Sequence, residues 1–185
     1  MENQHFESTD YSSRALPKGE YDNCTFANCN FANSDLSGTT FIECGFDNCN
    51  LSMATMYDTA LKDVKFSNCK LLGLNFKDCK TFLLALDFEG CLLNLASFHK
   101  LKLKSTRFKN CQLQETDFAE ADMTGATFDY CDLCGAIFEH TILEKADFRT
   151  AYSYSIDPEI NRIKKAKFSM QGLAGLLGKY DIEIE

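Results

Sequence analysis

The sequence contains few of the residue arrangements that carry chemistry. Its three histidines, His5, His99 and His140, are scattered, and none stands at a metal-ligand spacing from a cysteine or an acidic residue. It has no glycine-rich phosphate loop, no nucleophile elbow and no zinc-protease motif. These absences predict a protein that is not an enzyme and that uses neither a metal nor another cofactor.

Signals for export and for membrane insertion are also missing. Residues 1–21 carry acids where a secretory signal needs positive charge, and no apolar run follows them. The longest notable apolar run, Phe82 to Leu86, is far shorter than the roughly 20 residues of a membrane span. We therefore expect a cytoplasmic protein. Its net charge of −8 makes duplex nucleic acid and anionic membranes poor partners, unless a basic patch segregates on the surface.

What the sequence does have is a large apolar residue at every fifth position. One ladder runs upstream from Tyr21 to Phe76, and a second runs downstream in another phase. A period of five fits neither the repeat of about 3.6 residues of a helix face nor the two-residue repeat of a flat strand, so the chain must turn a corner in each unit. The downstream rungs are Phe88, Leu93, Phe98, Leu103, Phe108, Leu113, Phe118, Met123, Phe128, Leu133, Phe138, Leu143 and Phe148.

A second biased position lies two residues before each rung and holds mostly Cys, Ala, Thr or Ser. No acidic or basic residue between Glu20 and Arg149 falls on either position, which indicates that both point inward, because a buried unpaired charge is costly. Nine of the ten cysteines occupy the small inward position, which predicts reduced thiols packed in the core. Cys131 should point inward and Cys134 outward, an arrangement that excludes a redox pair and a zinc site.

The pattern of a small residue, then Asp, then Phe or Met recurs in Thr116–Glu120, Ala121–Gly125 and Ala146–Phe148. It resembles the pentapeptide-repeat family over about residues 20 to 150. The resemblance implies an all-β fold, a right-handed quadrilateral parallel β-helix with four pentapeptides in each coil and no internal cavity. With 20 residues in a coil, one face stacks Phe88, Phe108, Phe128 and Phe148, and the opposite face stacks Phe98, Phe118 and Phe138.

The two ladders are out of phase by two residues, because Phe76 and Phe88 are two residues further apart than two repeats. We divide the chain into an amino-terminal stack (1–81), a phase break (82–87), a carboxy-terminal stack (88–168) and a capping or dimerisation helix with its tail (169–185). The apolar residues of the break favour a packed corner. A functional loop is the alternative.

From Ser169 the apolar residues recur at three- and four-residue spacing, which predicts a short helix capped by Ser169. Glycines 172, 175 and 178 suggest that another backbone approaches closely, and residues 181–185 alternate like an edge strand. This end is more apolar than a cap requires, which favours a two-fold dimer over a monomeric cap. The predicted dimer interface consists of Met170, Leu173, Leu176, Leu177, Tyr180 and Ile182.

Charge is unevenly distributed along the rod. Residues 62–109 hold ten Lys or Arg against four acids, whereas residues 111–147 hold nine acids against Lys145 alone. We predict a partner-binding acidic face composed of Glu115, Asp117, Glu120, Asp122, Asp129, Asp132 and Glu139.

The two phased stacks and the tail Ile163–Ser169 leading to a short helix are similar to the topoisomerase-protecting branch of the family, the Qnr-type and albicidin-resistance-like proteins. The resemblance implies a non-enzymatic homodimer that mimics DNA, binds DNA gyrase or topoisomerase IV and modulates or protects it. It implies no direct binding of nucleic acid or membrane. The sequence departs from this branch in its lysine-rich middle and in having no long projecting loop. The alternative is a generic pentapeptide-repeat interaction scaffold with another partner.

Overall fold

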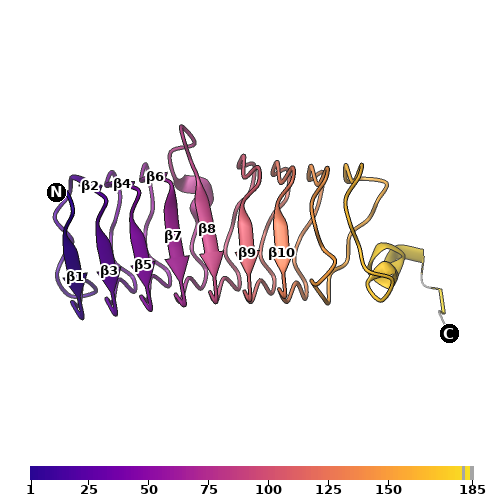
Figure 1. Cartoon of the computed structure of the whole chain (residues 1–185), viewed down its shortest axis with the longest axis horizontal. Helices are drawn as coiled ribbons and strands as arrows, with labels where there is room; N and C mark the ends of the chain where they lie inside the picture. The colour runs from indigo at the N-terminus through magenta and orange to yellow at the C-terminus, as the bar shows by residue number, and fades with distance from the viewer. Residues whose placement is uncertain (181, 184–185) are drawn as a thin grey trace.

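The chain winds into an elongated solenoid whose coils stack from the N-terminus to a short helical segment at the other end (Figure 1). The computed structural model describes residues 1–180 together with 182 and 183. Each coil turns at four corners, as five-residue units require. The expected parallel β-helix is confirmed.

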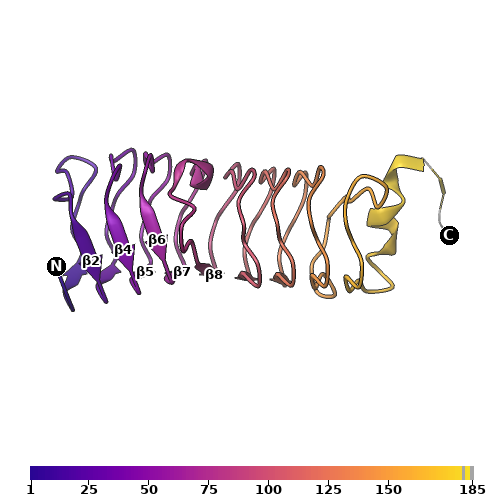
Figure 2. The same cartoon turned by 90° about the horizontal axis from the view of Figure 1, so that it is seen from above.

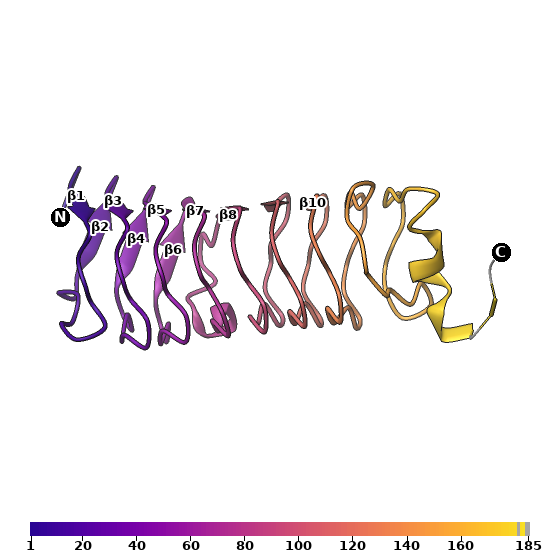
Figure 3. The ribbon, with the colours of Figure 1, turned by 90° about the horizontal axis from the view of Figure 1, so that it is seen from below.

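All strand pairing is parallel and joins equivalent positions of successive coils. Phe6 pairs with Phe26 and Phe26 with Phe46, so one coil takes 20 residues. Figures 2 and 3 show the second sheet, β2-β4-β6, beside the first. The first sheet has the order β1-β3-β5-β7-β8-β9-β10, with bounds β1 His5–Glu7, β3 Thr25–Ala27, β5 Gly45–Asp47, β7 Val64–Ser67, β8 Leu86–Glu89, β9 Arg107–Lys109 and β10 Thr127–Asp129. The second comprises β2 Glu20–Asp22, β4 Thr40–Ile42 and β6 Ala60–Lys62.

Isolated bridges continue the pairing where strands are too short to be assigned, and together with the sheets they define four faces. The first face is the seven-stranded sheet. The second follows the bridges from Asp10 through Asp132 to Tyr152, and the third those from Asp35 to Thr55 and from Asn75 through Asp117 to Ile137. The fourth face carries β2-β4-β6 and continues through the bridges that join positions 102, 122, 142 and 162.

The interior is built from two columns of stacked phenyl rings. In the first column Phe108 and Phe128 have ring centroids 5.2 Å apart and planes 2° from parallel. In the opposite column Phe98 and Phe118 stack at 5.4 Å and 3°. Neighbouring rings of the two columns meet edge to face, as Phe108 and Phe118 do at 84°. The predicted core rungs Phe88, Phe98, Phe108, Phe118, Phe128, Phe138 and Phe148 are all buried. Phe168 closes the first column by stacking on Phe148 at 5.3 Å.

The corners depend on a left-handed backbone conformation at the second residue after a rung. Met53, for example, has φ 57°, and the next N–H, of Ala54, donates to the carbonyl of the rung residue Leu51 at 3.1 Å. Asn and Gly tolerate this conformation best, and Asn28, Asn48 and Gly90 occupy such corners.

The small inward side chains bond to the backbone of the preceding coil. The Sγ–H of Cys49 donates to the carbonyl of Phe26 at 3.2 Å, and the Oγ1–H of Thr116 donates to that of Leu93 at 2.9 Å. Nine thiols are buried and free, and Cys134 is exposed, as predicted. Burial raises the pKa of the Cys44 thiol to about 11 and keeps it protonated.

The phase break is a local insertion that leaves the first sheet continuous. Ala60 pairs with Lys80 over 20 positions, whereas Val64 pairs with Leu86 over 22, so the two extra residues lie between 80 and 86. They follow the 3₁₀ turn η1 (Phe76–Asp78), and the loop into β8 rises above the outline of the rod (Figure 1). Phe82 and Leu83 are exposed. The expected packed corner is therefore wrong, because both inward positions of this coil are already filled.

The carboxy-terminal segment consists of two 3₁₀ helices, η2 (Leu173–Leu176) and η3 (Gly178–Tyr180), in place of one regular helix. The predicted cap is present, since the N–H of Gly172 donates to Ser169 Oγ at 3.1 Å. The close backbone approach is confirmed at Gly175, whose carbonyl accepts a 2.8 Å hydrogen bond from the N–H of Ile156. Of the predicted edge strand, Ile182 is not in a strand, and residues 181, 184 and 185 lie outside the described residues.

Candidate interaction surfaces

The predicted acidic residues are distributed around the whole rod and do not form one face. Asp117, Glu120 and Glu139 lie on the third face or its border, and Glu115 lies at the corner that leads onto it. Asp122 belongs to the fourth face, Asp129 to β10 on the first and Asp132 to the second. The prediction of a single acidic face is therefore corrected. Residues 111–147 wind almost twice around the rod, so a continuous stretch of sequence visits every side.

Basic residues of the preceding coil neutralise part of this acidic belt. Lys104 Nζ lies 3.3 Å from a carboxylate oxygen of Asp122, and Lys100 Nζ lies 3.3 Å from Glu120. Burial opposes ionisation of Asp122, but hydrogen bonds from Thr124 and the charge of Lys104 outweigh it, so the pKa of Asp122 is lowered.

The remaining acids face solvent with their charge uncompensated. Asp117 accepts hydrogen bonds from Ser97 Oγ at 3.1 Å and from the N–H of Ala119 at 2.9 Å, which fix its position without neutralising it. Within residues 1–180, 182 and 183, no Lys, Arg or His pairs with Glu115, Asp117 or Glu139. We call these three residues the acidic edge.

A basic patch lies on the fourth face, where sequence reasoning predicted none. Lys62, Lys80, Lys102 and Lys104 come from three successive coils around the exposed loop of the phase break. The uneven distribution of charge along the sequence indicated the lysines. Only the 22-residue coil places these four on one face while Lys70 and Lys77 lie elsewhere.

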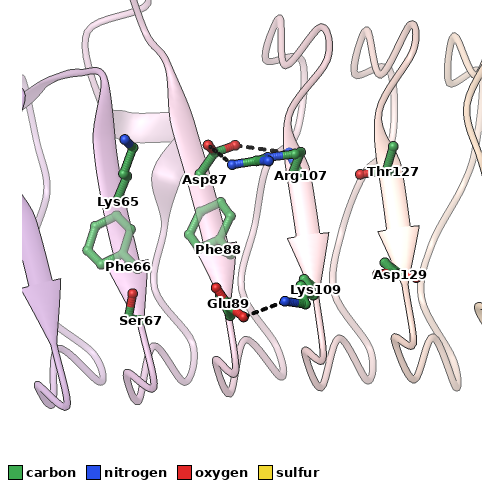
Figure 4. Close-up of a pocket in the computed structure, with 10 residues that line it drawn as sticks. All are labelled: Lys65, Phe66, Ser67, Asp87, Phe88, Glu89, Arg107, Lys109, Thr127 and Asp129. Carbon is green, nitrogen blue, oxygen red and sulfur yellow. Dashed lines mark hydrogen bonds and ion pairs between the residues drawn. The ribbon is translucent and has the colours of Figure 1, made fainter.

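The shallow groove on the first face is internally neutralised. Figure 4 shows it between two rows of side chains that flank Phe66 and Phe88. Arg107 pairs with Asp87 at 3.1 Å and Lys109 with Glu89 at 2.8 Å, each across one coil. Opposite charges that satisfy one another offer little to a charged partner, so we do not assign a site here.

The predicted dimer residues divide between the core and the surface. Leu176 packs against the core, and Leu177 is half-buried. Met170 is 80% exposed, and Leu173, Tyr180 and Ile182 are exposed as well. Lys179 fastens η3 to the solenoid, because its Nζ lies 2.8 Å from Asp157 and 2.6 Å from Glu159. This clasp leaves an apolar strip at the end of the rod.

The described part of the chain offers no group of three or more His, Cys, Asp or Glu side chains that could hold a metal ion. None of the helical segments within residues 1–180 and 182–183 combines the length and the apolar character needed to cross a bilayer.

Comparison with protein families identifies the fold. A model described as a pentapeptide repeat region matches residues 19–98 and 39–118. A model of pentapeptide repeats in eight copies matches residues 102–140 and 116–152. Together they cover most of the coils, and the chain belongs to the pentapeptide-repeat family.

Solved structures of other pentapeptide-repeat proteins are similar along nearly the whole chain. QnrB1, described as a plasmid-mediated fluoroquinolone resistance protein, has 21% identity and a TM-score of 0.47, covering 100% of this chain and 99% of that one. HetL from Nostoc sp. strain PCC 7120, described as involved in heterocyst differentiation regulation, has 15% identity and a TM-score of 0.24, covering 93% and 88%. Rfr23 from Cyanothece 51142 has 15% identity and a TM-score of 0.28, covering 91% and 86%. A search of curated proteins found no match.

Proposed function

We propose that the protein is a non-enzymatic, DNA-mimicking rod that binds a type II topoisomerase, DNA gyrase or topoisomerase IV, and modulates or protects it. The acidic edge carries this proposal. Glu115, Asp117 and Glu139 are held on a rigid parallel scaffold, and no cation within the described residues neutralises them. A positively charged DNA-binding groove is a complementary partner for such an edge.

The mimicry is partial. Successive coils are about 4.8 Å apart, whereas duplex DNA carries one charge per about 1.7 Å of helix axis. The edge therefore matches the sign of a duplex more than its charge density, and its binding should weaken steeply with added salt.

Gyrase supercoiling assays with matched charge-reversal variants test the proposal. The unmutated protein should inhibit supercoiling, or protect gyrase from a poison, at micromolar concentration. The triple variant Glu115→Lys, Asp117→Lys, Glu139→Lys should abolish the effect. The control variant Glu20→Lys, Glu43→Lys, Asp47→Lys makes the same change of net charge at exposed positions outside the acidic edge and should retain the effect. Equal losses in both triples would reduce the effect to net charge, and an unmutated protein without effect would contradict the proposal.

A generic protein-interaction scaffold is the second candidate. The pairing of Glu120 and Asp122 with lysines favours it, because these pairs remove charge that a duplex mimic would display. Recovery of no topoisomerase subunit in a pull-down from the native cell would support this alternative.

We further propose that two copies join at the carboxy-terminal end through the apolar strip of Met170, Leu173, Tyr180 and Ile182. The exposure of these side chains beside the clasped segment supports this arrangement. Sedimentation of the double variant Met170→Asp, Leu173→Asp should show a monomer, whereas Tyr130→Asp, which changes an exposed apolar residue elsewhere, should leave a dimer. Truncation is less suitable, because removing Gly175 would uncover Tyr154 and Ile156.

A further inference from the structure

The loop of the phase break presents apolar side chains to solvent at the point where the rod projects furthest (Figure 1). Phe82 is 74% exposed and Leu83 is 61% exposed. Leu83 also adopts φ 58°, the left-handed conformation that Gly or Asn occupies at most corners of the amino-terminal coils. A bulky residue in this conformation costs about 1 to 2 kcal/mol. The tip is thus both strained and exposed.

The solenoid itself does not need this tip. The rings of Phe66 and Phe88 stack across the insertion, and β7 pairs with β8 without a gap. A coil of ordinary length would make the same contacts. Strain without a structural return is typical of a functional position.

Lysines surround the tip. Lys80 precedes it in the same coil, and Lys102 follows Lys80 by the same 22 positions that separate the paired residues Asn75 and Ser97. Lys62 lies below, because the N–H of Ala85 bonds to the carbonyl of Leu61. Lys104 lies above and lines the same hollow as Leu84 and Ala85.

This patch is positive although the chain as a whole is acidic. Asp58 pairs with Lys80 at 3.3 Å, and Asp122 pairs with Lys104. No carboxylate in the described part of the chain pairs with Lys62 or Lys102. Asp63, at the neighbouring corner, is the nearby acid with no such partner.

We propose that Phe82, Leu83 and the surrounding lysines form a docking site for an anionic lipid surface. A bilayer presents a layer of negative headgroups above an apolar interior, which complements a projecting apolar tip with cations on every side. The flexible stems of lysine let the ammonium groups stay with the headgroups while Phe82 and Leu83 enter the acyl boundary. A protein pocket would need both a deep apolar hole and acids around its whole rim.

The negative charge of the rest of the chain sets the character of this docking. It repels an anionic surface from the acidic edge, so the fourth face must be the one that approaches. The repulsion also keeps the affinity low and makes it sensitive to salt. The docking is therefore peripheral and reversible, and it is independent of the proposed binding to a topoisomerase.

The absence of tryptophan provides a direct probe. Phe82→Trp introduces a single indole at the tip, and its emission should shift to shorter wavelength with phosphatidylserine-containing vesicles and stay unchanged with pure phosphatidylcholine vesicles. Leu95→Trp is the matched control, because Leu95 is also 61% exposed and left-handed, with φ 61°, but lies at the corner beside the acidic edge. Its emission should stay unchanged with both.

Charge reversal tests the contribution of the lysines. Lys62→Glu with Lys102→Glu should weaken vesicle partitioning at least tenfold, whereas Lys70→Glu with Lys77→Glu, on other faces, should change it less than twofold. An unshifted Phe82→Trp emission, an equal shift for Leu95→Trp, or partitioning that does not depend on Lys62 and Lys102 would each overturn the proposal. These assays contain no topoisomerase, so they fail or succeed separately from the proposed function.

Discussion

The rings of Phe66 and Phe88 stack with centroids 5.4 Å apart and planes 9° from parallel, although 22 residues separate them where neighbouring coils take 20. The aromatic column therefore determines how the coils stack, and the extra residues are expelled as a loop. A phase break in the sequence is a local bulge on one continuous rod.

Deleting Phe82 and Leu83 should leave the fold intact. The shortened coil has the ordinary length, and the left-handed leucine is removed, so we expect a melting temperature equal to or a few degrees above that of the unmutated protein. Circular dichroism during heating measures it. Loss of cooperative unfolding would show that the insertion is needed by the stack.

Removing a ring from the column should be costly. Phe128→Ala leaves a cavity between Phe108 and Phe148 and should reduce the free energy of unfolding by about 3 to 5 kcal/mol. Phe82→Ala deletes the same atoms at an exposed site and should change it by less than about 0.5 kcal/mol. Chemical denaturation of both variants compares them, and similar losses would contradict the assignment of inward and outward positions.

Two glycines should respond in opposite ways to the same substitution. Gly90 has φ 66°, and an added methyl group would also collide with Asn68 Oδ1, so Gly90→Ala should destabilise the protein by about 1 to 3 kcal/mol. Gly45 lies in β5 outside the left-handed region with room for a methyl group, so Gly45→Ala should be neutral or stabilise by up to about 1 kcal/mol. Equal effects would argue against corner strain.

The clasp at Lys179 should open in acid. The charge of Lys179 lowers the pKa values of Asp157 and Glu159 below their ordinary 3.8 and 4.5. Their contribution is therefore complete above the ordinary values and is lost as the pH falls through the lowered ones. Amide exchange in residues 170–180, corrected for the intrinsic rate, should accelerate over that range while the coils stay protected. Lys179→Ala should exchange fast at neutral pH, and an unchanged acid response in this variant would contradict the clasp.

The sequence was sufficient to predict the coils because burial at fixed spacing leaves a direct record. Phe108 and Phe128 are inward for the same reason that no charge falls in their phase. The inward thiols and the exposed Cys134 follow from position alone. The cap at Ser169 was also predictable, because its hydrogen bond is local.

Surface features were harder to predict, because they depend on which coil lies above which. The loop at Phe82 looked like a packed corner from composition, and only the register shows that no inward position remains for it. Neighbours in sequence such as Glu120 and Asp122 point from different sides, and their lysine partners lie 18 and 20 residues away. The glycines near 175 permit a helix only in 3₁₀ form against Tyr154.

Competition between this protein and linear duplex DNA for purified gyrase tests the account most directly. The labelled protein should bind gyrase, duplex DNA should displace it, and the variant Glu115→Lys, Asp117→Lys, Glu139→Lys should not bind, while the matched triple at Glu20, Glu43 and Asp47 should bind as before. Absence of binding, or binding that duplex DNA leaves undisturbed, would contradict the claim that the acidic edge occupies the groove of DNA.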